Sequence, residues 1–391
     1  MKILITSDWY SPAVNGVVTS VKNLRRGLEE RGHEVRVLTL SQTTRSWEED
    51  GVTYIGSVAA GLVYPGARLR TALAGRYVQE LVDWRPDVVH SQCEFSTFFL
   101  ARRIAEELQV PLVHTYHTVY EDYTRYFSPS VRFGKKAAAV FSRWVAAQTD
   151  CVIVPTGKVR SLLQGYGVDR PVCVVPSGID LNRFRQEPDP WRMAVLRSGL
   201  DIPRENLVLV SVGRLAEEKN LDELLNLRAE LGKAPVTLLL VGDGPDRPRL
   251  EGVAGGLGLT APDVVFAGMV PAEQVADWYQ LGDLFVSAST SETQGLTYVE
   301  ALAAGVPALC RADACLEGVI REGENGWTYR NSADFQRKLA LFQSQPHHYE
   351  KMAELARRSA EEFSLQRFAE RVEAVYRLQT AHHVKTGEVS A

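Results

Sequence analysis

Short apolar runs alternate with amphipathic segments along the chain, and this alternation constrains the fold more than any other feature. In residues 17–31, four apolar side chains beginning with Val17 keep one face of a predicted helix, which Gly32 ends. Strands are predicted at residues 2–7, 34–40, 52–56, 87–91, 111–117, 150–155, 171–176, 207–213, 236–242, 263–268, 283–288 and 306–311. Because strand–helix alternation builds parallel sheets wrapped by helices, the sequence predicts an α/β fold.

Length and a linker-like stretch predict two domains. The 391 residues exceed what one core of usual size holds. Residues 178–184, followed by a segment with two prolines, form the predicted linker. We expect one domain over residues 1–180 and a second over residues 181–363. A last helix near residues 364–380 is expected to pack back on the first domain, and the tail after Thr380 to be loose.

Composition narrows the class of protein. The net charge of −4 argues against nucleic-acid binding, and the five cysteines form no C-x-x-C pair, as expected of reduced thiols in the cytosol. The first strand is too short for a signal peptide, and no apolar run approaches the roughly 20 residues that span a bilayer. We expect a protein of the cytoplasm or of the inner membrane face. The sequence contains no D-x-D and no His/Cys/Asp cluster with ligand spacing, so we expect neither metal nor cofactor.

The segment from Ser289 to Glu300 is the strongest candidate for a ligand site. It joins a predicted strand to a predicted helix that Gly305 ends, with Glu292 in the turn and Glu300 one turn into the helix. Free amides at a helix N-terminus favour phosphate, and carboxylates accept hydrogen bonds from sugar hydroxyls. This pattern predicts binding of a nucleotide sugar. The alternative is an ordinary crossover with two solvated glutamates.

Two basic residues follow the first strand of the second half. Arg214 offers a planar fork and Lys219 a mobile charge, which suit a diphosphate and help it to leave. The alternative is a solvated loop. The turn at Gly242 and Gly244 lacks the third glycine of G-x-G-x-x-G, so a dinucleotide oxidoreductase is poorly supported.

Loops after strands of the first half hold further candidates. Gly16 opens the first helix and would let a ligand approach the backbone, although an ordinary turn fits as well. His117 ends a strand and could bond a sugar hydroxyl, whereas His114 is interpreted as structural. Tyr120 and Tyr126 could line an acceptor site or fill space under a loop.

Residues 131–147 form a predicted basic amphipathic helix. One face carries Arg132, Lys136 and Arg143 with Lys135 beside them, and another carries Phe133, Ala137, Val140, Phe141 and Trp144. Such a helix can lie in the headgroup region of an anionic membrane. The alternative is a surface helix whose apolar face covers the sheet.

Taken in this order, these residues resemble the GT-B glycosyltransferases of the retaining Glu-x7-Glu clan, whose two Rossmann-like domains face each other across a cleft. Three phrases narrow the resemblance to the bacterial 1,2-diacylglycerol 3-α-glucosyltransferases. They begin at Gln92 (QCEFS), His114 (HTYHTVYEDY) and Ser291 (SETQGL).

The resemblance implies a role for each matching position. Arg214 and Lys219 would hold the diphosphate, with Gly16 close to it. Glu292 would bond hydroxyls of the transferred sugar, and Glu300 the ribose. The remaining donor-site positions would be Gln294, Gly295, Leu296 and Thr297, and backbone amides near the last three would meet the sugar and the β-phosphate. His117 and Glu292 would be the catalytic residues. The family is expected to retain configuration without a covalent intermediate, whereas retaining glycosidases place two carboxyls about 5–5.5 Å apart. Glu292 is therefore not assigned as a nucleophile.

The implied activity is retaining α-glucosyl transfer from UDP-glucose to the 3-hydroxyl of 1,2-diacylglycerol at the cytoplasmic membrane face. The implied partners are a UDP-sugar, diacylglycerol and an anionic membrane surface, without nucleic acid. Four alternatives stay open: another acceptor, UDP-galactose as the sugar donor, a nucleotide-sugar 2-epimerase, and a lipid-surface binding protein with a relic donor site.

Overall fold

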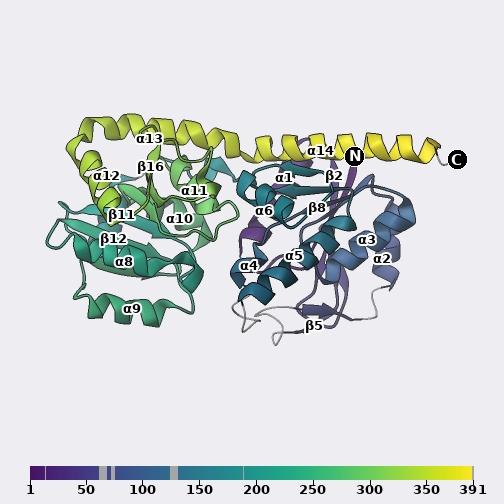
Figure 1. Ribbon diagram of the computed structural model, residues 1–391, viewed down its shortest axis with the longest axis horizontal. Coiled ribbons are helices and arrows are strands. Elements are labelled where there is room, and N and C mark those ends of the chain that lie inside the picture. The colour runs from purple at the N-terminus through teal and green to yellow at the C-terminus, as the bar shows by residue number, and fades with distance from the viewer. Residues whose placement is uncertain (14, 61–67, 72–74, 124–130, 188, 390–391) are drawn as a thin grey trace. The chain divides into compact units, whose positions relative to one another are not determined.

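A computed structural model describes residues 1–13, 15–60, 68–71, 75–123, 131–187 and 189–389. Its contacts divide the chain into two compact units (Figure 1). The N-terminal unit comprises Met1–Gly178 and Leu365–Ala391, and the C-terminal unit comprises Ile179–Ser364. The final segment of the chain therefore belongs to the same unit as its beginning.

The N-terminal unit is built on an eight-stranded sheet in the order β10-β9-β8-β7-β1-β2-β4-β3. All neighbouring strands are parallel except β3 and β4. Its strands are β1 (Lys2–Ser7), β2 (Glu34–Leu40), β3 (Trp47–Glu49), β4 (Val52–Ile55), β7 (Val88–Ser91), β8 (Leu112–Thr115), β9 (Cys151–Val154) and β10 (Val172–Val174). A separate antiparallel pair is formed by β5 (Ser57–Ala59) and β6 (Arg68–Arg70).

Helices cover both faces of this sheet, because alternate apolar residues of each strand point to opposite faces. Ile3 and Ile5 pack with α1 and α14, which lie along each other (Figure 1), whereas Leu4 packs with α2, α3 and α5. The helices are α1 (Gly16–Glu30), α2 (Gly75–Trp84), α3 (Ser96–Leu108), α4 (Tyr120–Tyr123), α5 (Val131–Ala147), α6 (Gly157–Gly165) and α14 (Leu365–Val389).

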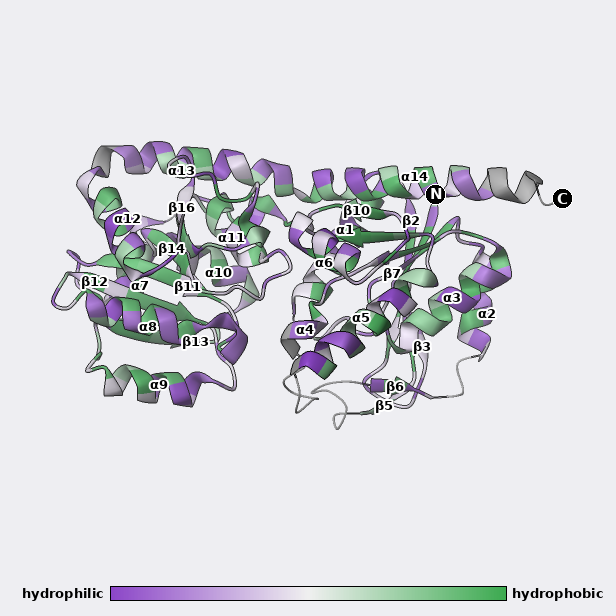
Figure 2. Cartoon of the chain, in the orientation of Figure 1, coloured by the Kyte–Doolittle hydropathy of each residue, from purple (hydrophilic) through white to green (hydrophobic). Residues whose placement is uncertain are grey.

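The C-terminal unit contains a six-stranded parallel sheet in the order β13-β12-β11-β14-β15-β16. Its strands are β11 (Leu207–Val212), β12 (Val236–Val241), β13 (Val264–Gly268), β14 (Leu284–Ser287), β15 (Ala308–Arg311) and β16 (Gly326–Tyr329). Its helices are α7 (Pro190–Gly199), α8 (Leu221–Glu230), α9 (Arg247–Gly256), α10 (Val275–Gln280), α11 (Leu296–Ala303), α12 (Ser332–Ser344) and α13 (Pro346–Ala360). The apolar strands of both sheets are largely green in Figure 2, whereas α8 carries both colours. Each unit thus buries its sheet between layers of amphipathic helices.

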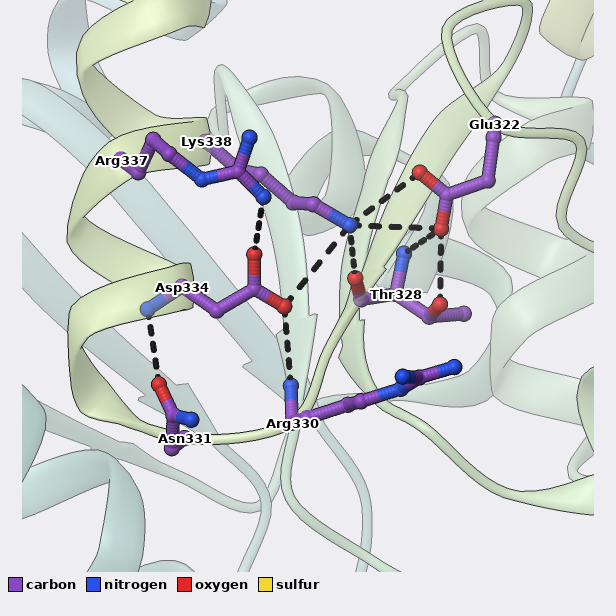
Figure 3. Close-up of polar contacts among 7 residues, drawn as sticks. All are labelled: Glu322, Thr328, Arg330, Asn331, Asp334, Arg337 and Lys338. Atoms are coloured by element: carbon purple, nitrogen blue, oxygen red, sulfur yellow. Dashed lines mark hydrogen bonds and ion pairs between the residues drawn. The ribbon is translucent and has the colours of Figure 1, made fainter.

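A polar cluster fixes the edge of the second sheet (Figure 3). Asn331 caps α12, because its Oδ1 accepts a hydrogen bond from the Asp334 amide at 2.9 Å. Lys338 then reaches from α12 to the Thr328 carbonyl of β16 and to Glu322, 3.2 Å away. The edge strand is held by side chains as well as by its backbone ladder.

The structure corrects several details of the sequence prediction. The tail after Thr380 was expected to be loose, but α14 continues to Val389. Pro190, which was interpreted as linker, begins a helix instead: it is the first residue of α7, and Asp189 caps the helix by accepting from the Trp191 amide at 3.0 Å. Helices α9 and α13 and strands β3, β5, β6 and β16 were not predicted. In α9 the reason is three glycines, which lower helix propensity.

No helix among the described residues is long and apolar enough to cross a membrane.

Candidate functional site

The predicted strand–turn–helix around Glu292 is present as β14, a loop and α11. Gly295 immediately precedes the helix with φ +73°, and a Cβ there would lie 2.2 Å from Tyr298 Cε2, so only glycine fits. Gly295 has no side chain with which to cap this helix, and the N-terminus of a helix favours an anion. Gln294 is buried, whereas Leu296 and Thr297 are partly exposed in and beside the first turn.

Lys219 and Glu292, 73 positions apart, form an ion pair. They meet because β11 and β14 are neighbouring parallel strands, whose carboxyl ends lie at one edge of the sheet. Ser291 ties the two loops together by donating to the Glu218 carbonyl at 2.9 Å. Arg214 is half exposed and pairs with Glu218. The structure therefore brings together the basic residues and the carboxylate that the sequence placed in one site.

Glu300 lies in α11 and accepts a hydrogen bond from the Tyr279 hydroxyl at 2.7 Å. Burial raises the pKa of this carboxyl, while Tyr279 and the nearby charge of Arg183 oppose the rise. Sequence reasoning missed both neighbours. Arg183 fell in the stretch interpreted as linker, and Tyr279 in a helix with no motif. The sequence signal for Tyr279 was a side chain with a polar hydroxyl on the apolar face of a predicted helix, because such a hydroxyl needs a hydrogen-bond partner.

In the N-terminal unit, Gly16 is the first residue of α1 and is exposed. Asn15 caps the helix by accepting from the Val18 amide at 2.9 Å. A Cβ added at Gly16 would meet nothing within 4 Å. The fold itself therefore does not require glycine here, and the position is open to a ligand.

His117 follows β8, and its Nε2 lies 2.7 Å from Gln92 Oε1 on the loop after β7. Burial lowers the pKa of His117 to about 4, although the charge of Glu94 acts in the opposite direction, so the ring is neutral at pH 7. The Tyr120 hydroxyl donates to Glu94 Oε2 at 2.6 Å. Tyr126 lies outside the described residues. Sequence reasoning assigned no role to Gln92 or Glu94.

Helix α5 exposes part of its apolar face instead of covering the sheet with all of it. Phe133, Val140 and Trp144 are 70%, 57% and 39% exposed, and the helix packs inward through Val145 and its small residues. Phe141 on the same face still packs against the core, so this face is divided between the core and the surface. Arg132, Lys136 and Arg143 are also exposed, whereas Lys135 lies 2.9 Å from Glu121 and is paired.

Two further aromatic side chains extend this face. Phe95 and Phe99, at the start of α3, are about half exposed at 50% and 49%. Phe95 stacks on Phe141 with ring centroids 5.8 Å apart, and Phe99 lies 5.8 Å from Trp144. Their spacing of four residues on one helix was the signal in the sequence. Together with α5 they form an apolar surface bordered by basic residues, which we call the aromatic surface.

The described residues contain no group of three or more His, Cys, Asp or Glu side chains that could hold a metal ion.

Comparisons with known proteins assign this architecture. The family described as Glycosyltransferase Family 4 matches residues 14–183, and the family described as Glycosyl transferases group 1 matches residues 194–359. The chain is 32% identical over 386 residues to the alpha-monoglucosyldiacylglycerol synthase of Acholeplasma laidlawii, covering 96% of each protein. This chain belongs to the GT-B glycosyltransferases. The glycosyltransferase also matches the alpha-monoglucosyldiacylglycerol synthase of Streptococcus pneumoniae, with 34% identity over 85% of this chain and 76% of that protein.

A solved structure supports the fold of this glycosyltransferase. Anabaena Alr3699/HepE in complex with UDP-glucose aligns with a TM-score of 0.73 at 18% identity, over 96% of this chain and 99% of that chain. The expected fold class and the expected enzyme class, a hexosyltransferase, are both confirmed.

Proposed function

We propose that this enzyme transfers glucose from UDP-glucose to the 3-hydroxyl of 1,2-diacylglycerol with retention, giving an α-linked monoglucosyl-diacylglycerol. It would act from the cytoplasm while bound peripherally to the inner face of the cell membrane. The observation that carries the lipid acceptor is the aromatic surface, since exposed Phe, Trp and Val side chains beside exposed arginine and lysine suit an anionic lipid interface. The names of the two relatives, both alpha-monoglucosyldiacylglycerol synthases, support it independently.

The C-terminal unit binds the sugar nucleotide in this proposal. Lys219 and Arg214 neutralise the diphosphate, and the amides at the N-terminus of α11 add the positive end of the helix dipole. Glu292 accepts hydrogen bonds from glucose hydroxyls, and Glu300, oriented by Tyr279, accepts from the ribose. Stabilising the charge that develops on the departing diphosphate lowers the barrier to C–O cleavage.

Two residues of the N-terminal unit complete the binding of the sugar nucleotide. The open position at Gly16 lets the backbone approach the diphosphate, and neutral His117 bonds the glucose. The bond between the anomeric carbon and the β-phosphate oxygen breaks as the acceptor oxygen bonds to the same face of that carbon. The proton of the acceptor hydroxyl passes to the departing phosphate oxygen, so neither a metal nor a cofactor is needed.

The test is UDP release from UDP-glucose and from UDP-galactose, in vesicles of an anionic phospholipid with and without 1,2-diacylglycerol. We expect release that depends on both UDP-glucose and diacylglycerol, with a glycolipid product. Release with a different acceptor would preserve the glycosyltransferase and discard the lipid assignment. A new nucleotide sugar formed without any acceptor would indicate the 2-epimerase. Vesicle binding without UDP release would indicate a lipid-surface binding protein.

A further inference from the structure

A buried carboxamide contacts His117, the histidine to which the proposed function gives a role in binding the sugar. Gln92 Oε1 lies 2.7 Å from His117 Nε2, and Gln92 is 2% exposed. A carboxamide oxygen only accepts hydrogen bonds, so Nε2 of His117 must carry the hydrogen. The other ring nitrogen, Nδ1, has no hydrogen-bond partner among the described residues and is not among the buried atoms that lack one. Nδ1 is therefore open to solvent or to a ligand.

The orientation of Gln92 is set by residues from three other parts of the unit. Its Nε2 lies 3.0 Å from Nε2 and 3.2 Å from Nδ1 of His90, and so over the face of that buried ring rather than in line with one nitrogen. His90 is held in turn by Thr115 Oγ1 of β8, at 2.7 Å, and by the Tyr376 hydroxyl of α14, at 2.6 Å. An amide N–H is favoured over the face of an aromatic ring and a carbonyl oxygen is not, so this contact keeps the oxygen of Gln92 towards His117.

The charge on His117 matters for this contact. Burial lowers the pKa of His117, His114 lowers it further, and Glu94 opposes both. Burial also keeps His90 uncharged, with its pKa well below the ordinary value. A neutral imidazole has one nitrogen that donates and one that accepts. With Nε2 donating to Gln92, Nδ1 of His117 is left as the acceptor.

We propose that Gln92 is a positioning residue, which holds His117 as the Nε2–H tautomer so that Nδ1 accepts a hydrogen bond from a hydroxyl of the bound sugar. This inference rests on the proposed function for the identity of the ligand, but not for the tautomer. It assigns the direction of the hydrogen bond: the sugar hydroxyl donates and the enzyme accepts. A protonated His117 would lose this ability, since both of its nitrogens would donate.

The direct test is the ¹⁵N spectrum of the histidine rings in the full-length protein without substrate. His117→Asn identifies the His117 signals. We expect the Nε2–H tautomer in the wild type and a mixture of tautomers in Gln92→Leu. The matched control is Gln164→Leu on the exposed face of α6, which should leave the His117 signals unchanged. An Nδ1–H tautomer in the wild type, or an unchanged His117 spectrum in Gln92→Leu, would overturn the proposal.

A second variant tests the consequence for turnover. Gln92→Glu keeps an acceptor at Nε2 but adds a negative charge, which raises the pKa of His117 by about 1–3 pH units. The acidic limb of the pH–activity profile should then shift to higher pH. Gln92→Leu should lower kcat without shifting this limb. An acidic limb at the wild-type position in Gln92→Glu would overturn the role in sugar binding. The tautomer is measured without substrate. A wrong tautomer would therefore refute the role of Gln92 separately from any failure of the enzyme to use UDP-glucose.

Discussion

The residues proposed to bind the sugar nucleotide and those around His117 are assembled in different ways. Lys219 and Glu292 come from short loops on neighbouring strands, each next to recognisable glycines and a helix start. The group around His117 joins residues as far apart as His90 and Tyr376, which are 286 positions from each other. A site built from local turns can be predicted from sequence. A site built on long-range buried contacts requires the structure.

The largest effect is expected in the first of these regions. Glu292→Gln removes the charge that pairs with Lys219 and that we propose accepts from sugar hydroxyls, so turnover should fall by about 10²–10³-fold while the fold is kept. UDP release and thermal unfolding measure the two quantities. Glu251→Gln, which removes an exposed carboxylate paired with Arg247, is the control and should retain activity. Near-normal UDP release by folded Glu292→Gln would remove this residue from the site.

The aromatic surface provides the next largest effect. Replacing Arg132, Lys136 and Arg143 with serine should weaken binding to anionic vesicles by roughly 3 kcal/mol, since each basic residue near such a surface contributes about 1 kcal/mol. Lys135 is left in place because Glu121 already pairs with it. Sedimentation with vesicles at low and high salt gives the affinity.

A matched set of three basic residues controls for net charge alone. This control variant replaces Arg76, Arg103 and Arg160 with serine and so removes the same charge from other helices of the unit. If both sets weakened vesicle binding equally, or neither did, α5 would have no special role at the membrane.

The attachment of α14 should show a pH dependence. Burial alone would raise the pKa of Glu373, but hydrogen bonds from Arg31, Arg377 and His33 together lower it to about 2. A carboxyl whose pKa is lowered in the folded state stabilises that state at pH values above its ordinary pKa of 4.5. This stabilisation is lost as the pH falls towards 2. Glu373→Gln should therefore lower the free energy of unfolding by about 2 kcal/mol at pH 7, and by progressively less in acid.

Urea unfolding at several pH values measures this difference. Glu370→Gln on the same helix, whose partner Arg367 is 3.4 Å away and exposed, should have little effect at any pH. A Glu373→Gln difference that did not shrink between pH 5 and pH 2 would show that charge is not what holds this contact.

The smallest effect is expected at Gly16. Gly16→Ala should leave stability within about 0.5 kcal/mol of the wild type, because no atom of the fold lies near the added methyl group. It should raise the KM for UDP-glucose several-fold by blocking close approach to the backbone. Gly157→Ala is the matched control, since Gly157 also opens a capped helix with free space around it. Equal KM values in both variants would leave Gly16 without a role in binding.

The same contrast explains what could be predicted from sequence. The strand–turn–helix from β14 to α11 was predicted because its apolar run, glycines and carboxylates are contiguous. The extension of α14 beyond Thr380 was not, because its apolar core residues, Phe368, Val372 and Tyr376, all precede that point, and residues 381–389 contain few apolar side chains and a glycine. Gln92 entered the sequence analysis only as the start of a phrase that narrows the resemblance, and no role could be assigned to it, since its contacts with His117 and His90 exist only in three dimensions.

The anomeric configuration of the product distinguishes the proposed reaction from its alternatives. Wild-type enzyme, UDP-glucose and 1,2-diacylglycerol vesicles would be incubated, and the extracted lipid examined by ¹H NMR and mass spectrometry. The account predicts a single glucose, α-linked to the 3-hydroxyl of diacylglycerol. A β-linked product, free glucose, or glucose attached to another acceptor would contradict it.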